Sequence, residues 1–150
     1  RPNNKIFLAF DGSENAASAL EFVGSLLGGF DYEVSLFHAI RSNGEGQPEY
    51  QHIFSSKAYA KTASKEMASA LKAAQIKLID MGLKADKVST QIDEQAISRA
   101  GKIVDKAQQE DFGTIVMGRR GHSHVRDFFI GRVTNKVIHM ARDRTVWVIR

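Results

Sequence analysis

Short apolar runs alternate along this chain with longer stretches whose apolar residues recur at helical spacing. Five runs are strand-like, and four periodic stretches separate them. Strands that alternate with helices pair in parallel through right-handed crossovers, because each helix returns the chain to the same end of the sheet. The alternation predicts an α/β fold, namely an open five-stranded parallel sheet in the order 3-2-1-4-5. Helices are expected on both faces, in the doubly wound, Rossmann-like arrangement.

Local signals give the bounds of the predicted elements. Ser13 is a typical N-cap for the first helix, and Gly28-Gly29 a typical end for it. The predicted strands are residues 5–10, 32–40, 87–92, 114–117 and 145–149. The predicted helices cover residues 14–27, 57–81, 96–107 and 133–141.

The 150 residues are enough for one domain with its own core, so we expect a single domain over residues 1–150. Within it, residues 1–4 are expected to form a disordered start and residues 41–56 a long polar loop.

The chain has no cysteine, which excludes a disulfide scaffold, a thiol nucleophile and a cysteine zinc site. No apolar run approaches the ~18 residues of a membrane span, and the polar start lacks a signal-peptide pattern. We therefore expect a cytoplasmic protein without membrane insertion.

Positive charge is concentrated in the last part of the chain. Residues 118–150 contain eight basic and two acidic side chains, a net of +6, whereas the whole chain has a formal net charge of +4. Charge of one sign on one segment either attracts an anionic ligand or forms a solvated face. The charge distribution alone leaves both interpretations open.

A glycine pattern follows the fourth predicted strand and leads into the last predicted helix. Gly118 and Gly121 enclose two arginines, and Gly131 comes after nine further residues. Glycines allow backbone amides to turn toward a phosphate, and the amino end of a helix adds unpaired donors. In the predicted strand order, ligands bind at the carboxyl ends of the first and fourth strands, where the order switches direction. Asp11 and Gly118 are therefore expected to face the same anion site.

Over residues 5–150 the chain resembles the universal stress protein family. Nucleotide-binding members of that family carry the motif G-x2-G-x9-G-[S/T], and Gly118, Gly121 and Gly131 match its glycines. Asp11-Gly12-Ser13 also looks like the end of the family's first strand. The resemblance implies binding of ATP, or of AMP or ADP, with Mg or Mn as a candidate companion. It also implies a role in stress response or signalling through nucleotide-dependent conformation or assembly.

The resemblance implies a role for each matched position. Asp11 would meet the ribose, or a Mg or Mn ion held by the phosphates, and Arg120 lies inside the glycine pattern. The implied contacts to adenine are Ala9, Phe10 and Ala39, those to the ribose and phosphates are Met117, Gly118 and Gly121, and those to the triphosphate are Gly131, Val133 and Thr134.

Arg132 departs from the motif, which has Ser or Thr at this position, so the short phosphate-binding hydroxyl is missing. Loss of one neutral hydrogen bond costs only about 0.5–1.5 kcal/mol, and that alone does not abolish binding. The guanidinium can contact the phosphates, fill the phosphate pocket or turn to solvent. If Arg132 has abolished ATP binding, the alternative function is a nucleotide-free dimeric interaction module.

Other chemistries are disfavoured by what the chain lacks. An enzyme of the adenine-nucleotide hydrolase type needs a glycine-rich pyrophosphate loop after the first strand, whereas residues 11–14 contain one glycine. No general base is evident, so we expect at most slow ATP hydrolysis. The arginines lack interleaved aromatic residues, which disfavours nucleic acid as a partner.

His122 and His124 have only Asp11 as a nearby acid, too few ligands for a protein-only metal site. His38 is interpreted as a packed histidine.

The last predicted strand, residues 145–149, is apolar and is expected at an edge of the sheet. An uncovered apolar edge is a template for pairing with another chain. The family resemblance also implies dimerisation through this strand. We expect a homodimer, or a tandem pseudo-dimer if the natural chain continues, with Trp147 either in the core or at this interface.

Overall fold

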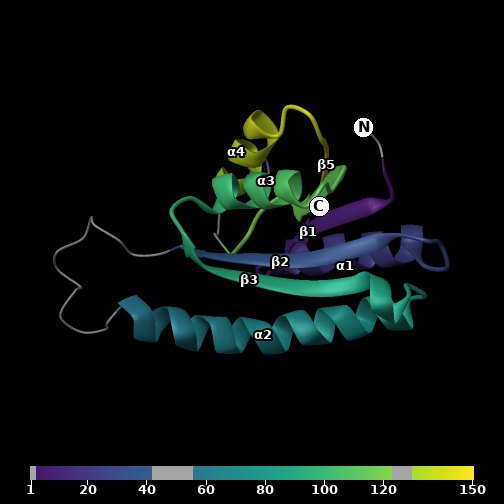
Figure 1. Cartoon of the computed structure of the whole chain (residues 1–150), viewed down its shortest axis with the longest axis horizontal. Helices are drawn as coiled ribbons and strands as arrows, with labels where there is room; N and C mark the ends of the chain where they lie inside the picture. Colours follow the sequence, from purple (N-terminus) through teal and green to yellow (C-terminus); the bar gives the residue numbers. More distant parts are fainter. Residues whose placement is uncertain (1–2, 42–55, 123–129) are drawn as a thin grey trace.

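A computed structural model describes residues 3–41, 56–122 and 130–150, with the side chains of residues 56–60 left out. The strands are β1 (Lys5–Ala9), β2 (Glu33–Arg41), β3 (Val88–Ala96), β4 (Thr114–Gly118) and β5 (Thr145–Ile149). The helices are α1 (Glu14–Leu27), α2 (Ser56–Asp80), α3 (Arg99–Gln109) and α4 (Arg132–Met140), with a short 3-10 turn η1 (Ala85–Lys87) before β3. The strands form one parallel sheet in the order β3-β2-β1-β4-β5, which confirms the predicted fold (Figure 1).

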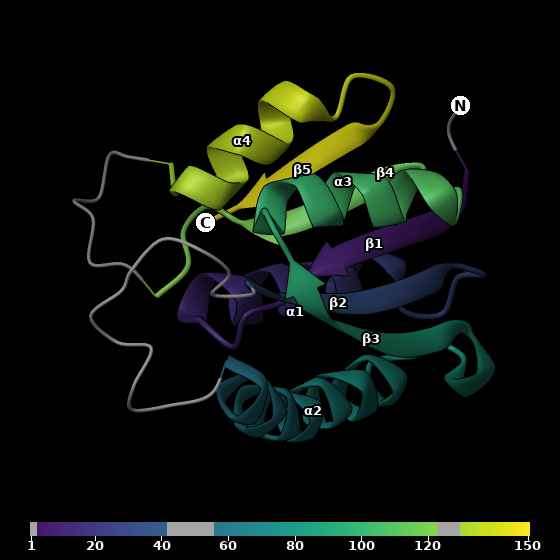
Figure 2. The same ribbon diagram turned by 60° about the vertical axis from the view of Figure 1, so that its left-hand side comes forward.

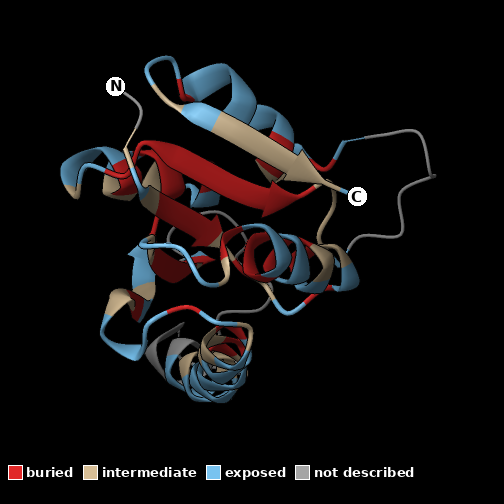
Figure 3. Ribbon diagram, turned by 90° about the vertical axis from the view of Figure 1, so that its right-hand side faces the viewer, coloured by how far each residue is buried: buried red, intermediate tan, exposed pale blue. Residues whose placement is uncertain are grey.

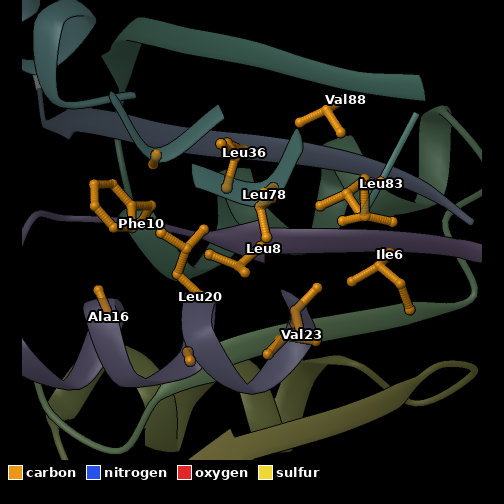
Figure 4. Close-up of a cluster of buried hydrophobic side chains, with 14 of the residues drawn as sticks. Ile6, Leu8, Phe10, Ala16, Leu20, Val23, Leu36, Leu78, Leu83 and Val88 are labelled. Carbon is orange, nitrogen blue, oxygen red and sulfur yellow. The ribbon is translucent and has the colours of Figure 1, made fainter. Parts of the chain in front are cut away.

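Each face of the sheet carries its own apolar core. On one face, side chains from β1 and β2 pack against α1 and α2, with Leu8, Leu36 and Leu78 fully buried among them (Figure 4). On the other face, Phe7 lies between Phe37 and Phe112, with ring centroids 5.0 and 5.2 Å apart, under α3 and α4. Burial on both faces explains why the central strands read as continuous apolar runs.

Helix α1 begins and ends where its local signals predict. The Ser13 hydroxyl caps the helix by accepting a hydrogen bond from the Ala16 amide at 3.2 Å. Gly28 is the C-cap, and Gly29 follows with a φ of +85°, a conformation that glycine adopts without steric cost.

Helix α3 begins later than predicted, because β3 is longer. Ala96 was expected to open the helix, but it is the last residue of β3 and pairs with Arg41 beyond a register shift in the β2–β3 ladder. Ile97, expected on the apolar stripe of the helix, is 88% exposed. Ser98 then caps α3 by accepting from the Gly101 amide at 3.2 Å. An apolar pair at a strand end reads like the first turn of an amphipathic helix, and only the strand pairing separates the two.

Two segments expected to be irregular are partly ordered. Asn3, in the expected disordered start, donates from its side chain to the Asp111 carbonyl at 2.8 Å and accepts from the Gly113 amide at 2.9 Å. Asn4 donates to the Asp31 carbonyl at 2.7 Å. Of the expected loop 41–56, Arg41 ends β2 and Ser56 begins α2, and the rest lies outside the described residues.

Strand β5 lies at the edge of the sheet, as predicted, and is less buried than the strands beside it (Figure 3). Trp147 is half-buried and meets Phe22 of α1 edge to face, with ring centroids 6.1 Å apart. Among the described residues, no helix is long and apolar enough to cross a membrane.

Candidate functional site

All five strands end at the same side of the molecule (Figure 2), and the strand order switches direction between β1 and β4. These neighbours pair through Ile6 with Thr114 and Leu8 with Val116. The chain leaves β1 toward α1 on one face and leaves β4 toward α4 on the other. Open parallel sheets bind ligands beyond the carboxyl ends of the strands at such a switch in strand order.

The structure brings Asp11 and the glycine segment after β4 together. A Cβ atom added to Gly121 would lie 2.5 Å from Oδ2 of Asp11, so the carboxylate rests directly against this glycine. The Nε2 atom of His122 lies 2.8 Å from the Asp11 carbonyl oxygen. A carbonyl oxygen only accepts, so Nε2 carries the proton and donates. The two strand ends thus share one polar cluster.

The Asp11 carboxylate is held in place by its own turn. Its Oδ1 atom accepts from the Ser13 amide at 2.9 Å, and Gly12 between them has a φ of +77°. The other oxygen faces Gly121. One carboxylate oxygen therefore orients the side chain, and the second lies against the glycine segment.

Gly118 and Thr134 attach the end of β4 to two helices. A Cβ atom on Gly118 would lie 2.6 Å from the backbone carbonyl carbon of Asn15, so α1 passes directly over the end of β4. The Thr134 hydroxyl, in a side chain only 3% exposed, donates to the Gly118 carbonyl at 2.9 Å. The hydroxyl proton of Thr134 is thus used within the protein, and this residue positions α4 against β4.

The amino end of α4 lies close to the glycine segment. Gly131 caps the helix, and its own amide donates to the Arg119 carbonyl at 2.8 Å. The first bond of the helix runs from the Asn135 amide to the Gly131 carbonyl at 2.9 Å. The amides of Arg132, Val133 and Thr134 therefore have no intrahelical acceptor, and the helix dipole makes this end electropositive. The Arg132 side chain is exposed.

The residues expected around adenine divide between the two faces of the sheet. Ala39, Met117 and Ala9 lie on the α3–α4 face, where Ala39 and Met117 are each 5% exposed. The Phe10 ring is buried in the opposite core, so only its backbone belongs to the carboxyl edge. Of the three residues expected around adenine, Ala9 and Ala39 thus lie on one face and the Phe10 ring on the other, while Met117, expected at the ribose and phosphates, lies on the same face as the two alanines.

His38, interpreted from the sequence as a packed histidine, also hydrogen-bonds across the carboxyl edge of the sheet. Its Nδ1 atom lies 2.9 Å from the Phe10 carbonyl and must donate to it, which links the ends of β1 and β2. Burial lowers the pKa of His38, whereas the Phe10 carbonyl and the nearby Asp11 carboxylate oppose that shift. The ring is therefore neutral near pH 7, with an unprotonated Nε2.

No group of three His, Cys, Asp or Glu side chains that could hold a metal ion occurs among the described residues. His124 and the rest of residues 123–129 lie outside them. Arg120 is half-buried. A Cβ atom added to Gly131 would lie 3.3 Å from the Arg120 Cα atom.

The fold and this edge define a doubly wound α/β domain whose glycine segment and helix amino end meet at the switch in strand order. The sequence matches the model of the Universal stress protein family over residues 2–150, and the chain belongs to that family. No curated protein matches the chain.

Solved structures of the same fold include two with bound nucleotides. The hypothetical protein MJ0577 is 26% identical, with a TM-score of 0.81 over 97% of this chain and 94% of its own. A universal stress protein from Archaeoglobus fulgidus, solved in complex with dAMP, is 21% identical, with a TM-score of 0.68 over 99% of this chain and 98% of its own. A universal stress protein solved in complex with cAMP is 14% identical, with a TM-score of 0.69 over 98% of this chain and 97% of its own.

Proposed function

We propose that this chain binds an adenine nucleotide (ATP, ADP or AMP) at the carboxyl ends of β1 and β4. It acts in stress response or signalling through nucleotide-dependent conformation or assembly. One observation carries the proposal: the Asp11 carboxylate, the glycine segment from Gly118 to Gly121 and the amino end of α4 converge there. The complexes of two family members with dAMP and cAMP support this choice of ligand.

The arrangement suggests how the nucleotide would lie. The base would lie at the carboxyl ends of the strands near Ala9 and Ala39, which are on the α3–α4 side of the sheet. Asp11 would accept hydrogen bonds from ribose hydroxyls, and the amides at the start of α4 would donate to phosphate oxygens. A Mg or Mn ion would take most of its ligands from the phosphates and water, with Asp11 as the protein oxygen.

The test compares Gly121→Val with wild type by calorimetric titration of ATP, ADP and AMP. We expect at least a tenfold loss of affinity, because the new side chain would occupy the space against Asp11. Asp11→Ala should also weaken binding. Gly101→Ala is the matched control, since its Cβ would meet Ser98 and Met140 only at ordinary contact distances of 3.5 Å or more. Unchanged affinity in both Gly121→Val and Asp11→Ala would contradict the proposed site.

The same preparation tests the alternative function. Mass spectrometry of the small molecules released on denaturing freshly purified protein should detect an adenine nucleotide. A chain that neither releases nor binds such a nucleotide, but still dimerises, would be a nucleotide-free interaction module instead.

We further propose that assembly uses the free edge of β5, as a homodimer or a tandem pseudo-dimer. The Thr145 amide bonds the Gly113 carbonyl at 3.1 Å, and the Ile149 carbonyl accepts from the Arg119 amide at 2.7 Å. Both residues thus turn their backbone groups toward β4. Because these groups alternate in direction along a strand, Val146 and Val148 turn theirs outward.

An apolar surface continues from β5 onto α1. Phe22 is 42% and Leu26 47% exposed, and Phe22 touches the half-buried Trp147. Exposed apolar side chains beside an unpaired strand edge are the composition expected of an interface between copies.

A further inference from the structure

The guanidinium of Arg119 contains two buried nitrogens, Nε and Nη2, that have no hydrogen-bond partner within the part of the chain that the structure describes. A guanidinium is always charged, and burying its donors without an acceptor is unfavourable. Buried cationic groups in native proteins are normally paired with an anion. These two nitrogens therefore indicate an anionic partner that the described residues do not supply.

The chemistry of the two nitrogens narrows the class of anion. Nε–H and the adjacent Nη2–H form the side-on edge of the guanidinium, where two parallel donors match two oxygens of one phosphate or carboxylate. In the described residues, the carboxylates that form ion pairs are Glu21, Asp31, Asp93 and Glu110, and each is paired with lysine. None of these pairs involves the connection from β4 to α4. A two-oxygen anion is the chemical match for this edge.

The position of Arg119 favours a phosphoryl group. Its backbone is fixed on both sides: the amide donates to the Ile149 carbonyl at 2.7 Å, and the carbonyl accepts from the Gly131 amide at 2.8 Å. Gly131 is the N-cap of α4, so Arg119 is hydrogen-bonded to the electropositive amino end of this helix. The residue also lies between Gly118 and Gly121 of the glycine segment.

We propose that the side-on edge of Arg119 binds a phosphoryl group of the nucleotide, an inference that rests on the proposed function. Arg119 then supplies the charge at the phosphate end of the site, while the exposed Arg132, which replaces the motif hydroxyl, does not. The site would accordingly select phosphorylated adenine nucleosides over adenosine.

Arg119→Met tests this inference, because methionine keeps an unbranched apolar stem without the donors. Calorimetric titration should show at least a tenfold loss of affinity for AMP and ATP, with adenosine affinity unchanged. Arg119→Lys should have an affinity between those of wild type and Arg119→Met, because an ammonium keeps the charge but lacks two parallel donors. Arg132→Gln should lose less affinity for AMP and ATP than Arg119→Met does. The control is Arg142→Gln, at an exposed position beyond the carboxyl end of α4, which should bind all three ligands like wild type.

The melting temperature without ligand separates a binding role from a structural one. Removing a buried charge that lacks a partner should leave the melting temperature of Arg119→Met equal to or above that of wild type. A clear fall, or equal losses for AMP and adenosine, would overturn the inference. Unchanged affinity for AMP and ATP in Arg119→Met would also overturn it.

Inorganic phosphate distinguishes failure of this inference from failure of the proposed function. If wild type binds no adenine nucleotide, phosphate should still raise its melting temperature, and Arg119→Met should abolish that rise. This result would retain the phosphoryl site and reject the nucleotide. No rise in wild type, together with no nucleotide binding, would reject both.

Discussion

At the scale of single residues, the first two glycines of the motif meet different neighbours. An added Cβ on Gly118 would strike the backbone of Asn15, which cannot move without shifting α1. On Gly121 it would strike only the end of the Asp11 side chain, which can rotate away. The first glycine is therefore required for packing, and the second keeps the Asp11 carboxylate beside the glycine segment.

We predict that alanine separates these two roles. Gly118→Ala should lower the free energy of unfolding by about 1–3 kcal/mol, the usual cost of overpacking. Gly121→Ala should leave the free energy of unfolding within about 0.5 kcal/mol of wild type but weaken nucleotide binding. Urea unfolding and calorimetric titration measure the two effects. Equal destabilisation by both variants would show that the Asp11 side chain cannot rotate away from the new methyl group.

The neutral state of His38 predicts a pH dependence of stability. Burial lowers its pKa in the folded protein, whereas the pKa of an unfolded histidine is about 6.5. Between these values the unfolded chain binds more protons, so the free energy of unfolding falls as pH drops below about 6.5. The fall ends once pH is below the folded pKa.

His38→Asn should flatten that profile, because asparagine can still donate to the Phe10 carbonyl but does not titrate. Urea unfolding at a series of pH values from 7.5 to 5 provides the measurement. His139→Asn is the control, because it removes a histidine of α4 that is not among the groups acting on His38. A slope that persists in His38→Asn would contradict the assignment to this ring.

At the scale of elements, α1 and α3 have the same kind of cap in different surroundings. Ser13 and Ser98 each accept from a backbone amide at 3.2 Å, but Ser13 is buried and Ser98 is exposed. The turn before α1 also contains Asp11, so the start of this helix and the candidate site are one structure.

We predict that Ser13→Ala lowers the free energy of unfolding by about 1–2 kcal/mol and Ser98→Ala by about 0.5–1 kcal/mol. The buried amide of Ala16 loses its only cap and has no access to water, whereas the Gly101 amide can be solvated. Urea unfolding of both variants tests the order. A larger loss for Ser98→Ala would contradict the role of burial.

At the scale of the whole molecule, the two edge strands differ in composition. Strand β5 has an apolar sequence, half-buried side chains and an apolar helix face beside it. Strand β3, at the other edge, contains polar residues, including exposed Ser89 and Thr90. Only the β5 edge therefore resembles a pairing surface.

We predict that wild type sediments as a dimer at tens of micromolar and that Val148→Pro is a folded monomer. Proline removes an amide that faces away from β4, so the internal ladder keeps its bonds. Val148→Lys should also dissociate the dimer, and Thr90→Lys, with the same charge on β3, should not. A folded Val148→Pro that remains dimeric would show that assembly uses another surface.

The order of the elements was predictable from the sequence because it depends on local signals. Apolar periodicity, the Ser13 cap and Gly28-Gly29 act over a few residues, and β5 has the predicted bounds. The glycine spacing likewise predicted where backbone segments approach closely, as they do at Gly118 and Gly131. The start of α3 was mispredicted because the extra length of β3 depends on pairing with β2.

The directions and partners of individual side chains were decided by the tertiary structure. The sequence could not place the Phe10 ring and Ala39 on opposite faces, or pair the Thr134 hydroxyl with Gly118, sixteen residues away. It also did not single out Arg119 from its neighbour Arg120. That two of its guanidinium nitrogens lack a partner among the described residues is a property of the folded chain, which residue type alone does not reveal. Local patterns determine which elements form, whereas contacts between distant segments determine which donors remain for a ligand.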